Sequence, residues 1–157
     1  MGRDFKSYPP MEGLVKKSTL LPKIQKLREF IDNLESLQKE FKNREKFLKD
    51  FKQQYALSKA VEFCTESIKD ISYTLLKIYS IRSKKFKSLE EALSQLHKKG
   101  ILSAGFPKLI QDWIEFRNKL VHDYLGFDAK TLFDHNHENL RFFKLFLKEV
   151  VNYLDVH

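Results

Sequence analysis

The sequence predicts an all-α protein, folded as an antiparallel bundle of about five helices. Gly and Pro are scarce, with 5 and 4 residues among 157, whereas Lys, Glu, Gln and Leu, which favour helices, are abundant. Apolar residues recur every three or four positions over two long stretches, as they do along one face of a helix. A chain of this length has room for one compact domain, and a second full domain is not expected.

The predicted bundle begins with two long helices. Residues 1–18, with Pro9, Pro10 and Gly13, are expected to form a flexible leader, which leaves 19–157 as the domain. A turn and a short helix near Asn43 should join the long helices, the second of which runs from about 51 to 81. Their apolar stripes consist of Leu20, Ile24, Leu27, Ile31, Leu34 and Phe41, and of Leu57, Val61, Cys64, Ile68, Ile71, Leu75 and Ile78.

Three further helices follow. Ser88 stands three residues before Glu91, the spacing of a capping box, and should open a short helix that Gly100 closes. Pro107 fits the first turn of a fourth helix that runs to about residue 122. Asp128 is the expected cap of one last helix, with an apolar stripe of Leu132, Phe133, Leu140, Phe143, Leu147, Val150, Val151 and Leu154.

Composition limits the class of protein. A formal charge of +8 and a pI of about 9.4 permit binding to a phosphate backbone, although a solubilising lysine-rich surface has the same composition. The single Cys64 excludes an internal disulfide and a four-cysteine zinc site, and its apolar neighbours predict a core residue. No stretch approaches the roughly 20 apolar residues needed to span a bilayer, so a cytoplasmic protein is expected.

Arg117 breaks the pattern of the fourth helix. On a helical wheel of about 100° per residue, the apolar residues of this helix cluster around it. A permanently charged guanidinium in an apolar stripe needs a carboxylate, a phosphate or a cleft, or else its head reaches water or pairs with a neighbour such as Asp70. His122 shares a helix edge with Asn118, and is either a dipole partner of the helix end or a catalyst. Tyr124 adds a hydroxyl nearby.

Four residues separate Arg117 from His122, and one residue separates His122 from Tyr124. This spacing resembles the signature of the HEPN ribonucleases, specifically the HepT-like toxins. The wording of residues 116–124, Phe-Arg-Asn-Lys-Leu-Val-His-Asp-Tyr, is close to that of the family. The similarity spans about 20–153 and includes the Gly100-Ile101-Leu102 joint and the final Phe-rich helix. The resemblance implies a homodimer whose two motif segments face one another across a cleft.

The same resemblance implies a metal-independent endoribonuclease without a cofactor. His122 would act as general acid or base when a ribose 2′-hydroxyl attacks the adjacent phosphodiester, and Arg117 would stabilise the charge that develops on the phosphoryl oxygens. Asn118 would orient the phosphate or the imidazole. Asp70 is a candidate auxiliary residue on the second long helix, although Tyr73 stands where the family commonly has Asn.

A partner is implied as well, because HepT-like proteins are commonly encoded beside a minimal nucleotidyltransferase antitoxin. In this family the tyrosine of the motif can be modified with AMP, which makes Tyr124 the expected target. The added phosphate charge and bulk would block the cleft beside the catalytic residues. The alternative function is a non-catalytic subunit that binds the nucleotidyltransferase and presents Tyr124 or a nucleotide pocket.

Other polar clusters have two interpretations each. Candidate RNA-binding residues are Lys119, Arg82, Lys84 and Lys85, although a solvated charge run is typical of such segments. His135 and His137, with Asp134 and Glu138, are more typical of a solvated helix surface than of a metal site. The aromatic side chains of the last helix are expected in the core or in a dimer interface, namely Phe142, Phe143 and Phe146.

Overall fold

The computed structural model describes residues 11–79, 88–103, 108, 111–113, 115–116 and 128–156. Within these residues every regular element is a helix, which confirms the all-α prediction, and residues 111–113 and 115–116 are helical too. The helices are α1 (Met11–Glu40), α2 (Arg44–Lys49), α3 (Phe51–Ile78), α4 (Leu89–Lys98), α6 (Ala129–Asp134) and α7 (Asn136–Val156).

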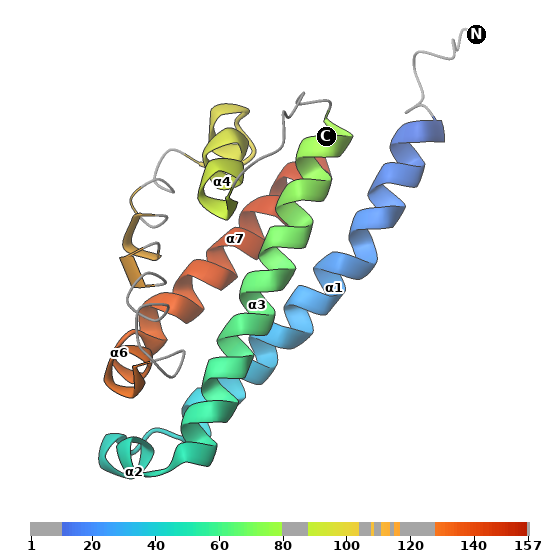
Figure 1. Ribbon diagram of the computed structural model, residues 1–157. Coiled ribbons are helices and arrows are strands. Elements are labelled where there is room, and N and C mark those ends of the chain that lie inside the picture. Colours follow the sequence, from blue (N-terminus) through green and yellow to red (C-terminus); the bar gives the residue numbers. More distant parts are fainter. Residues whose placement is uncertain are drawn as a thin grey trace, which may run out of the picture.

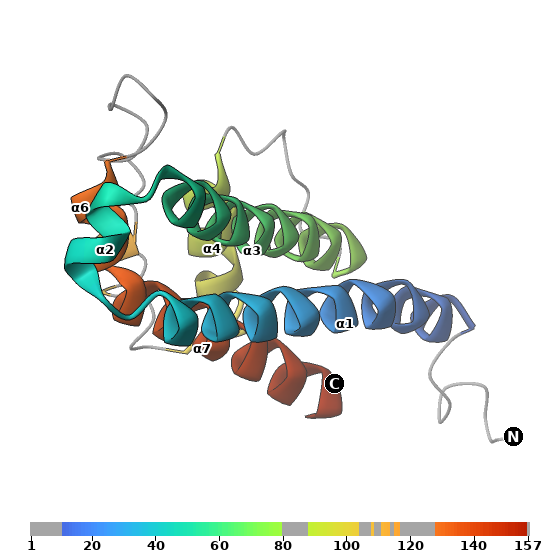
Figure 2. The same cartoon turned by 90° about the horizontal axis from the view of Figure 1, so that it is seen from below.

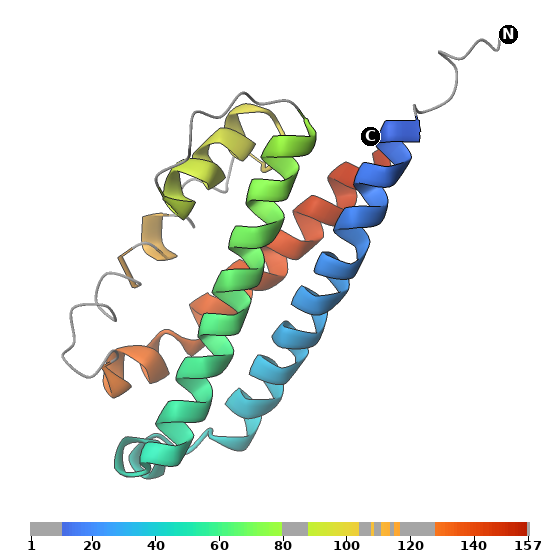
Figure 3. The same cartoon turned by 45° about the vertical axis from the view of Figure 1, so that its right-hand side comes forward.

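The centre of the fold is formed by three long helices, α1, α3 and α7. α1 and α3 run antiparallel along most of their length, and α7 packs across both (Figures 1 and 3). Leu20, Leu27 and Leu34 on α1 and Leu57 and Ile68 on α3 are completely buried, as their spacing predicts. The two stripes thus form one core between these helices.

α1 begins at Met11, inside the segment expected to be a leader. Among the side chains whose burial is described, the first in the core is Leu20, which lies inside the predicted domain of residues 19–157. The division into leader and domain stays a prediction, because helical backbone before Leu20 does not by itself make these residues part of the domain.

Side-chain caps define the ends of the shorter elements. The Asn43 side chain accepts a hydrogen bond from the Lys46 amide (3.0 Å) at the start of α2, and the Asp50 carboxylate accepts from the amides of Lys52 (3.0 Å) and Gln53 (3.2 Å) at the start of α3. These bonds satisfy amides that have no partner inside the helix. The short helix expected near Asn43 is confirmed as α2.

The predicted boundaries of α4 are confirmed on both sides. Ser88 Oγ accepts from the Glu91 amide at 3.1 Å. At the other end, the Gly100 amide donates to the His97 carbonyl (3.0 Å) and the Ile101 amide to that of Leu96 (2.9 Å), the pair of bonds that defines a Schellman motif. Gly100 adopts a φ of 79°, the left-handed conformation for which glycine is suited.

The last predicted helix is wrong in one respect, because two helices replace it. Asp128 caps α6 by accepting from the Lys130 amide (3.0 Å), and α6 ends at Asp134. His135 separates it from α7, whose first residue, Asn136, accepts a hydrogen bond from Gln38 Nε2 (3.0 Å). α6 lies against α2 (Figure 2), whereas α7 continues to α1 and α3. One straight helix could not pack against α2 and also against α1 and α3.

The core is closed by aromatic side chains of α7. Phe142, Phe143 and Phe146 are buried, as predicted for the core. Cys64 is buried too, and this burial raises the pKa of its thiol to about 12. The thiol therefore stays protonated near neutral pH, which confirms Cys64 as a core residue.

Surface ion pairs connect the helices from outside. Lys23 pairs with Asp70 (2.8 Å), Arg44 with Asp134 (3.0 Å) and Lys144 with Glu35 (2.7 Å). Exposed pairs of this kind contribute little to stability, so apolar packing holds the bundle together. Over the described ranges, none of the helices has the length and hydropathy needed to cross a bilayer.

Candidate functional site

Most residues of the predicted site lie outside the described part of the chain. They are the motif residues Arg117, Asn118, Lys119, His122 and Tyr124, and the basic residues Arg82, Lys84 and Lys85. Their roles stay predictions. The residues that precede the motif and those that pack against them are described, and they define the surroundings of the site.

Asp70 is the one predicted site residue whose position is described. It lies on α3, and both oxygens of its carboxylate accept hydrogen bonds from Lys23 Nζ on α1, each at 2.8 Å. Its side chain is 55% exposed. Among the described residues, Lys23 is a cation that pairs with Asp70, and the auxiliary role of Asp70 stays a prediction.

The segment directly before Arg117 is fixed to α7 by aromatic packing. Trp113 and Phe116 are both buried. The Trp113 ring stacks on Phe142 with centroids 4.7 Å apart and planes at 9°, and meets Phe143 edge-on at 6.4 Å. Aromatic pairs of this geometry contribute about 0.5–1.5 kcal/mol beyond the burial of their area. Trp113 and Phe116, which precede the motif, are thus part of the core.

His135 joins this aromatic group instead of the solvated surface expected for it. Its ring lies 5.2 Å from that of Phe116, tilted by 38°. His135 Nδ1 is 2.9 Å from the Thr131 carbonyl oxygen. A carbonyl only accepts, so this contact requires the proton on Nδ1 and leaves Nε2 as an acceptor in the neutral ring.

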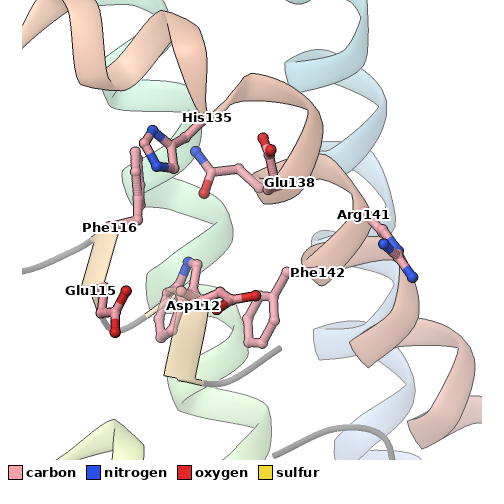
Figure 4. Close-up of a pocket in the computed structure, with 9 residues that line it drawn as sticks. Asp112, Glu115, Phe116, His135, Glu138, Arg141 and Phe142 are labelled. Carbon is pink, nitrogen blue, oxygen red and sulfur yellow. The ribbon is translucent and has the colours of Figure 1, made fainter. Parts of the chain in front are cut away.

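A pocket of about 240 Å³ lies between the segment before Arg117 and the start of α7. Phe116 and His135 lie close together on one side, and the carboxyls of Asp112, Glu115 and Glu138 surround the space (Figure 4). The described residues that line it are Asp112, Trp113, Glu115, Phe116, His135, Glu138, Asn139, Arg141 and Phe142.

Asn139 is the polar residue that sequence reasoning missed. It is 1% exposed and lines the pocket, and its amide nitrogen has no hydrogen-bond partner in the structure. The sequence holds the signal for it, because Asn139 stands three residues before Phe142 and four before Phe143. A polar residue therefore lies in an apolar stripe, the same pattern that singles out Arg117.

The residues of the histidine and carboxylate cluster near α6 make separate contacts. Asp134 accepts a hydrogen bond from Arg44, which lowers the pKa of its carboxyl, and His137 and Glu138 are exposed. Among the residues whose positions are described, no group of three or more His, Cys, Asp or Glu side chains is placed to hold a metal ion.

Comparison with solved structures identifies the class of fold. The chain is similar to the tri-AMPylated HEPN toxin of Shewanella oneidensis, solved in complex with an MNT antitoxin, with a TM-score of 0.69 and 16% sequence identity. The match covers 85% of this chain and 96% of the toxin. At this identity the likeness shows the fold, which is the all-helical HEPN fold.

The sequence model of the family described as ribonuclease HepT-like matches residues 27–150. This range is most of the chain, and the protein therefore belongs to the HepT-like ribonuclease family. The family resemblance stated from the motif is confirmed. No curated protein sequence matches the chain.

Proposed function

We propose that the protein is the toxin of a toxin–antitoxin pair and a metal-independent endoribonuclease. The observation that carries this proposal is the family match over residues 27–150, because this range contains the complete Arg117, His122 and Tyr124 motif. Support for the toxin assignment comes from the HEPN toxin of similar fold, which was solved with its antitoxin.

The proposed reaction uses the 2′-hydroxyl of the RNA as nucleophile. His122 takes the hydroxyl proton, the 2′-oxygen bonds to the adjacent phosphorus, and the 5′-oxygen leaves and is protonated. The products are a 2′,3′-cyclic phosphate and a 5′-hydroxyl. Arg117 stabilises the charge on the phosphoryl oxygens, and Asn118 orients the phosphate or the imidazole.

The proposed active form is a homodimer in which two motif segments form a composite site at the cleft. Lys119 and the basic residues Arg82, Lys84 and Lys85 contact the phosphate backbone of the RNA. The proposed partner is a minimal nucleotidyltransferase antitoxin that transfers AMP to Tyr124. The tri-AMPylated state of the Shewanella toxin supports a tyrosine target of this kind.

The test is cleavage of a mixed tRNA and mRNA pool in EDTA by the wild type, Arg117→Ala and His122→Ala. Loss of acid–base catalysis should lower the rate by about 10²–10⁴-fold for His122→Ala, and Arg117→Ala should lose a comparable factor. The matched control is Arg28→Ala, which replaces an exposed arginine and should keep the wild-type rate.

Two outcomes contradict the proposal. Equal cleavage by all variants would identify a contaminating nuclease. If no variant cleaves RNA and mass spectrometry shows Tyr124 unmodified, the protein acts instead as the non-catalytic subunit that binds the nucleotidyltransferase.

A further inference from the structure

We propose that the pocket before Arg117 is a binding site for an adenine base. The position of the pocket in the chain suggests that it binds part of the substrate, since Phe116 lines the pocket and the proposed catalytic residue Arg117 directly follows Phe116. The inference therefore deepens the proposed ribonuclease function and rests on it. The pocket would select the nucleotide beside the phosphate that is cleaved.

The size and the walls of the pocket fit one planar ring. Its volume of about 240 Å³ is below the roughly 300–1,000 Å³ of sites for drug-sized ligands. Phe116, Trp113 and Phe142 give it aromatic walls. Proteins bind unstacked bases on aromatic side chains of this kind.

Asn139 provides a hydrogen-bond donor and an acceptor that adenine can satisfy. Asn139 lines the pocket, and its amide nitrogen is buried and has no partner in the structure. A buried donor without a partner is unfavourable, and a ligand that accepts from it removes this cost. The Asn side chain matches adenine in both directions, because it donates to a ring nitrogen and accepts from the adjacent amino group.

The charges around the pocket favour a base over a phosphate. Asp112, Glu115 and Glu138 are exposed on its rim, so their carboxylates repel phosphate and accept from an amino group. His135 Nε2 is a further acceptor in the neutral ring, since Nδ1 lies 2.9 Å from the Thr131 carbonyl oxygen. Uracil has no amino group and matches this arrangement less well.

Arg141 and Lys148 of α7 are the cationic side chains proposed for the backbone attached to the base. Arg141 lines the base pocket and also a neighbouring groove of about 420 Å³, together with Lys148 and with Lys144, which pairs with Glu35 at 2.7 Å. In Figure 4 its guanidinium points away from Phe142 and Asp112. The base would enter the acidic pocket while the phosphates follow the basic row of α7.

Trp113 is the sole tryptophan of the sequence, and its position in the pocket makes its fluorescence a direct probe. The experiment titrates the full-length Arg117→Ala variant, in which catalysis is removed, with AMP and with UMP. We expect AMP to quench Trp113 at concentrations at least ten-fold below those required for UMP. Equal quenching by both nucleotides, or quenching by neither, would overturn the proposal.

A second variant assigns the effect to Asn139. Asn139→Leu keeps the side-chain volume and replaces the amide by an apolar group, so the helix should stay folded, as circular dichroism and the melting temperature can show. We expect this change to abolish the preference for AMP over UMP. The matched control is Asn152→Leu on the exposed face of α7, which should keep the preference; loss of the preference there would contradict the assignment.

Two sources can supply the adenine, an adenosine of the RNA and AMP carried on Tyr124. If RNA supplies it, Asn139→Leu in the otherwise wild-type chain lowers cleavage beside adenosine at least ten-fold relative to other sites. If the modification supplies it, cleavage sites do not change, and AMP-modified protein shows Trp113 already quenched. Quenching of Trp113 by AMP without any RNA cleavage would support adenine binding in the pocket and contradict the proposed ribonuclease activity. RNA cleavage without quenching would support the ribonuclease activity and contradict adenine binding.

Discussion

Single polar residues within apolar stripes are the most informative feature at the scale of the residue. Arg117 is singled out by this rule, and Asn139, which is 1% exposed, obeys it equally well. The contact between His135 and Phe116 follows no such pattern. It depends on the change of direction between α6 and α7, which brings together residues 19 positions apart in the chain.

Asp128 gives a pH-dependent prediction. The hydrogen bond from Thr131 Oγ1, at 2.9 Å, is the main reason that the pKa of its carboxyl lies below the ordinary value of 3.8. A lowered folded-state pKa means that this stabilisation is present above the unfolded pKa and is lost as the pH falls through the folded one. Asp128→Ala should therefore destabilise the protein at pH 7, and the difference should narrow below pH 3.8.

At neutral pH we expect a loss near the low end of the roughly 0.5–2 kcal/mol known for helix caps, because the carboxyl is largely exposed. Urea unfolding at pH 7 and pH 3 measures the effect. Asp32→Ala, an exposed change on α1, is the control and should shift stability by less than about 0.5 kcal/mol. An equal loss for Asp128→Ala at both pH values would refute the assignment.

Whole elements were predictable where their boundaries depend on neighbouring residues in the sequence. Ser88 and Gly100 define α4 through bonds within the segment itself, and the sequence shows both. The break between α6 and α7 has a distant cause, because Phe133 of α6 packs on Phe47 of α2 at 5.2 Å. Residues 86 positions apart determine it, so the apolar period alone predicts one continuous helix.

Gly100 provides a test at this scale. Its φ is 79°, and a Cβ at this position would meet no atom within 4 Å, so only backbone strain opposes a side chain. Gly100→Ala should lower the free energy of unfolding by about 1–2 kcal/mol, whereas Gly100→Asn should cost less, because Asn tolerates the left-handed region. Denaturant titration compares them, and an unchanged Gly100→Ala protein would contradict the role of the glycine.

For the whole molecule, the sequence predicts the fold class and the family, because both depend on features within one chain. The helix count was only approximate, since it requires the tertiary break at His135. The proposed dimer cleft and partner surface would involve other chains, and no pattern within this sequence gives their geometry. The motif is visible in the sequence, whereas the pocket depends on the packing of Asp112, Trp113, Glu115 and Phe116 against residues distant in the chain.

The extent of the domain is testable by truncation. Among the side chains whose burial is described, Leu20 is the first that belongs to the core. A protein that starts at residue 19 should unfold within about 0.5 kcal/mol of the full chain. A protein that starts at residue 29 lacks Leu20, Ile24 and Leu27, and should be several kcal/mol less stable. Thermal melts compare the three, and a large loss from the shorter deletion would move the domain boundary towards Met11.

α3 contacts every other helix labelled in Figure 1, and its buried positions include neighbouring pairs such as Ile71 and Ser72 or Leu75 and Leu76. Inward-facing positions therefore occupy a wide arc of this helix. During evolution, α3 has few positions at which a change affects only one partner. Sequence divergence within such a bundle would be concentrated on the outer faces of α1 and α7. Substitutions on α3 would require compensating substitutions on several other helices.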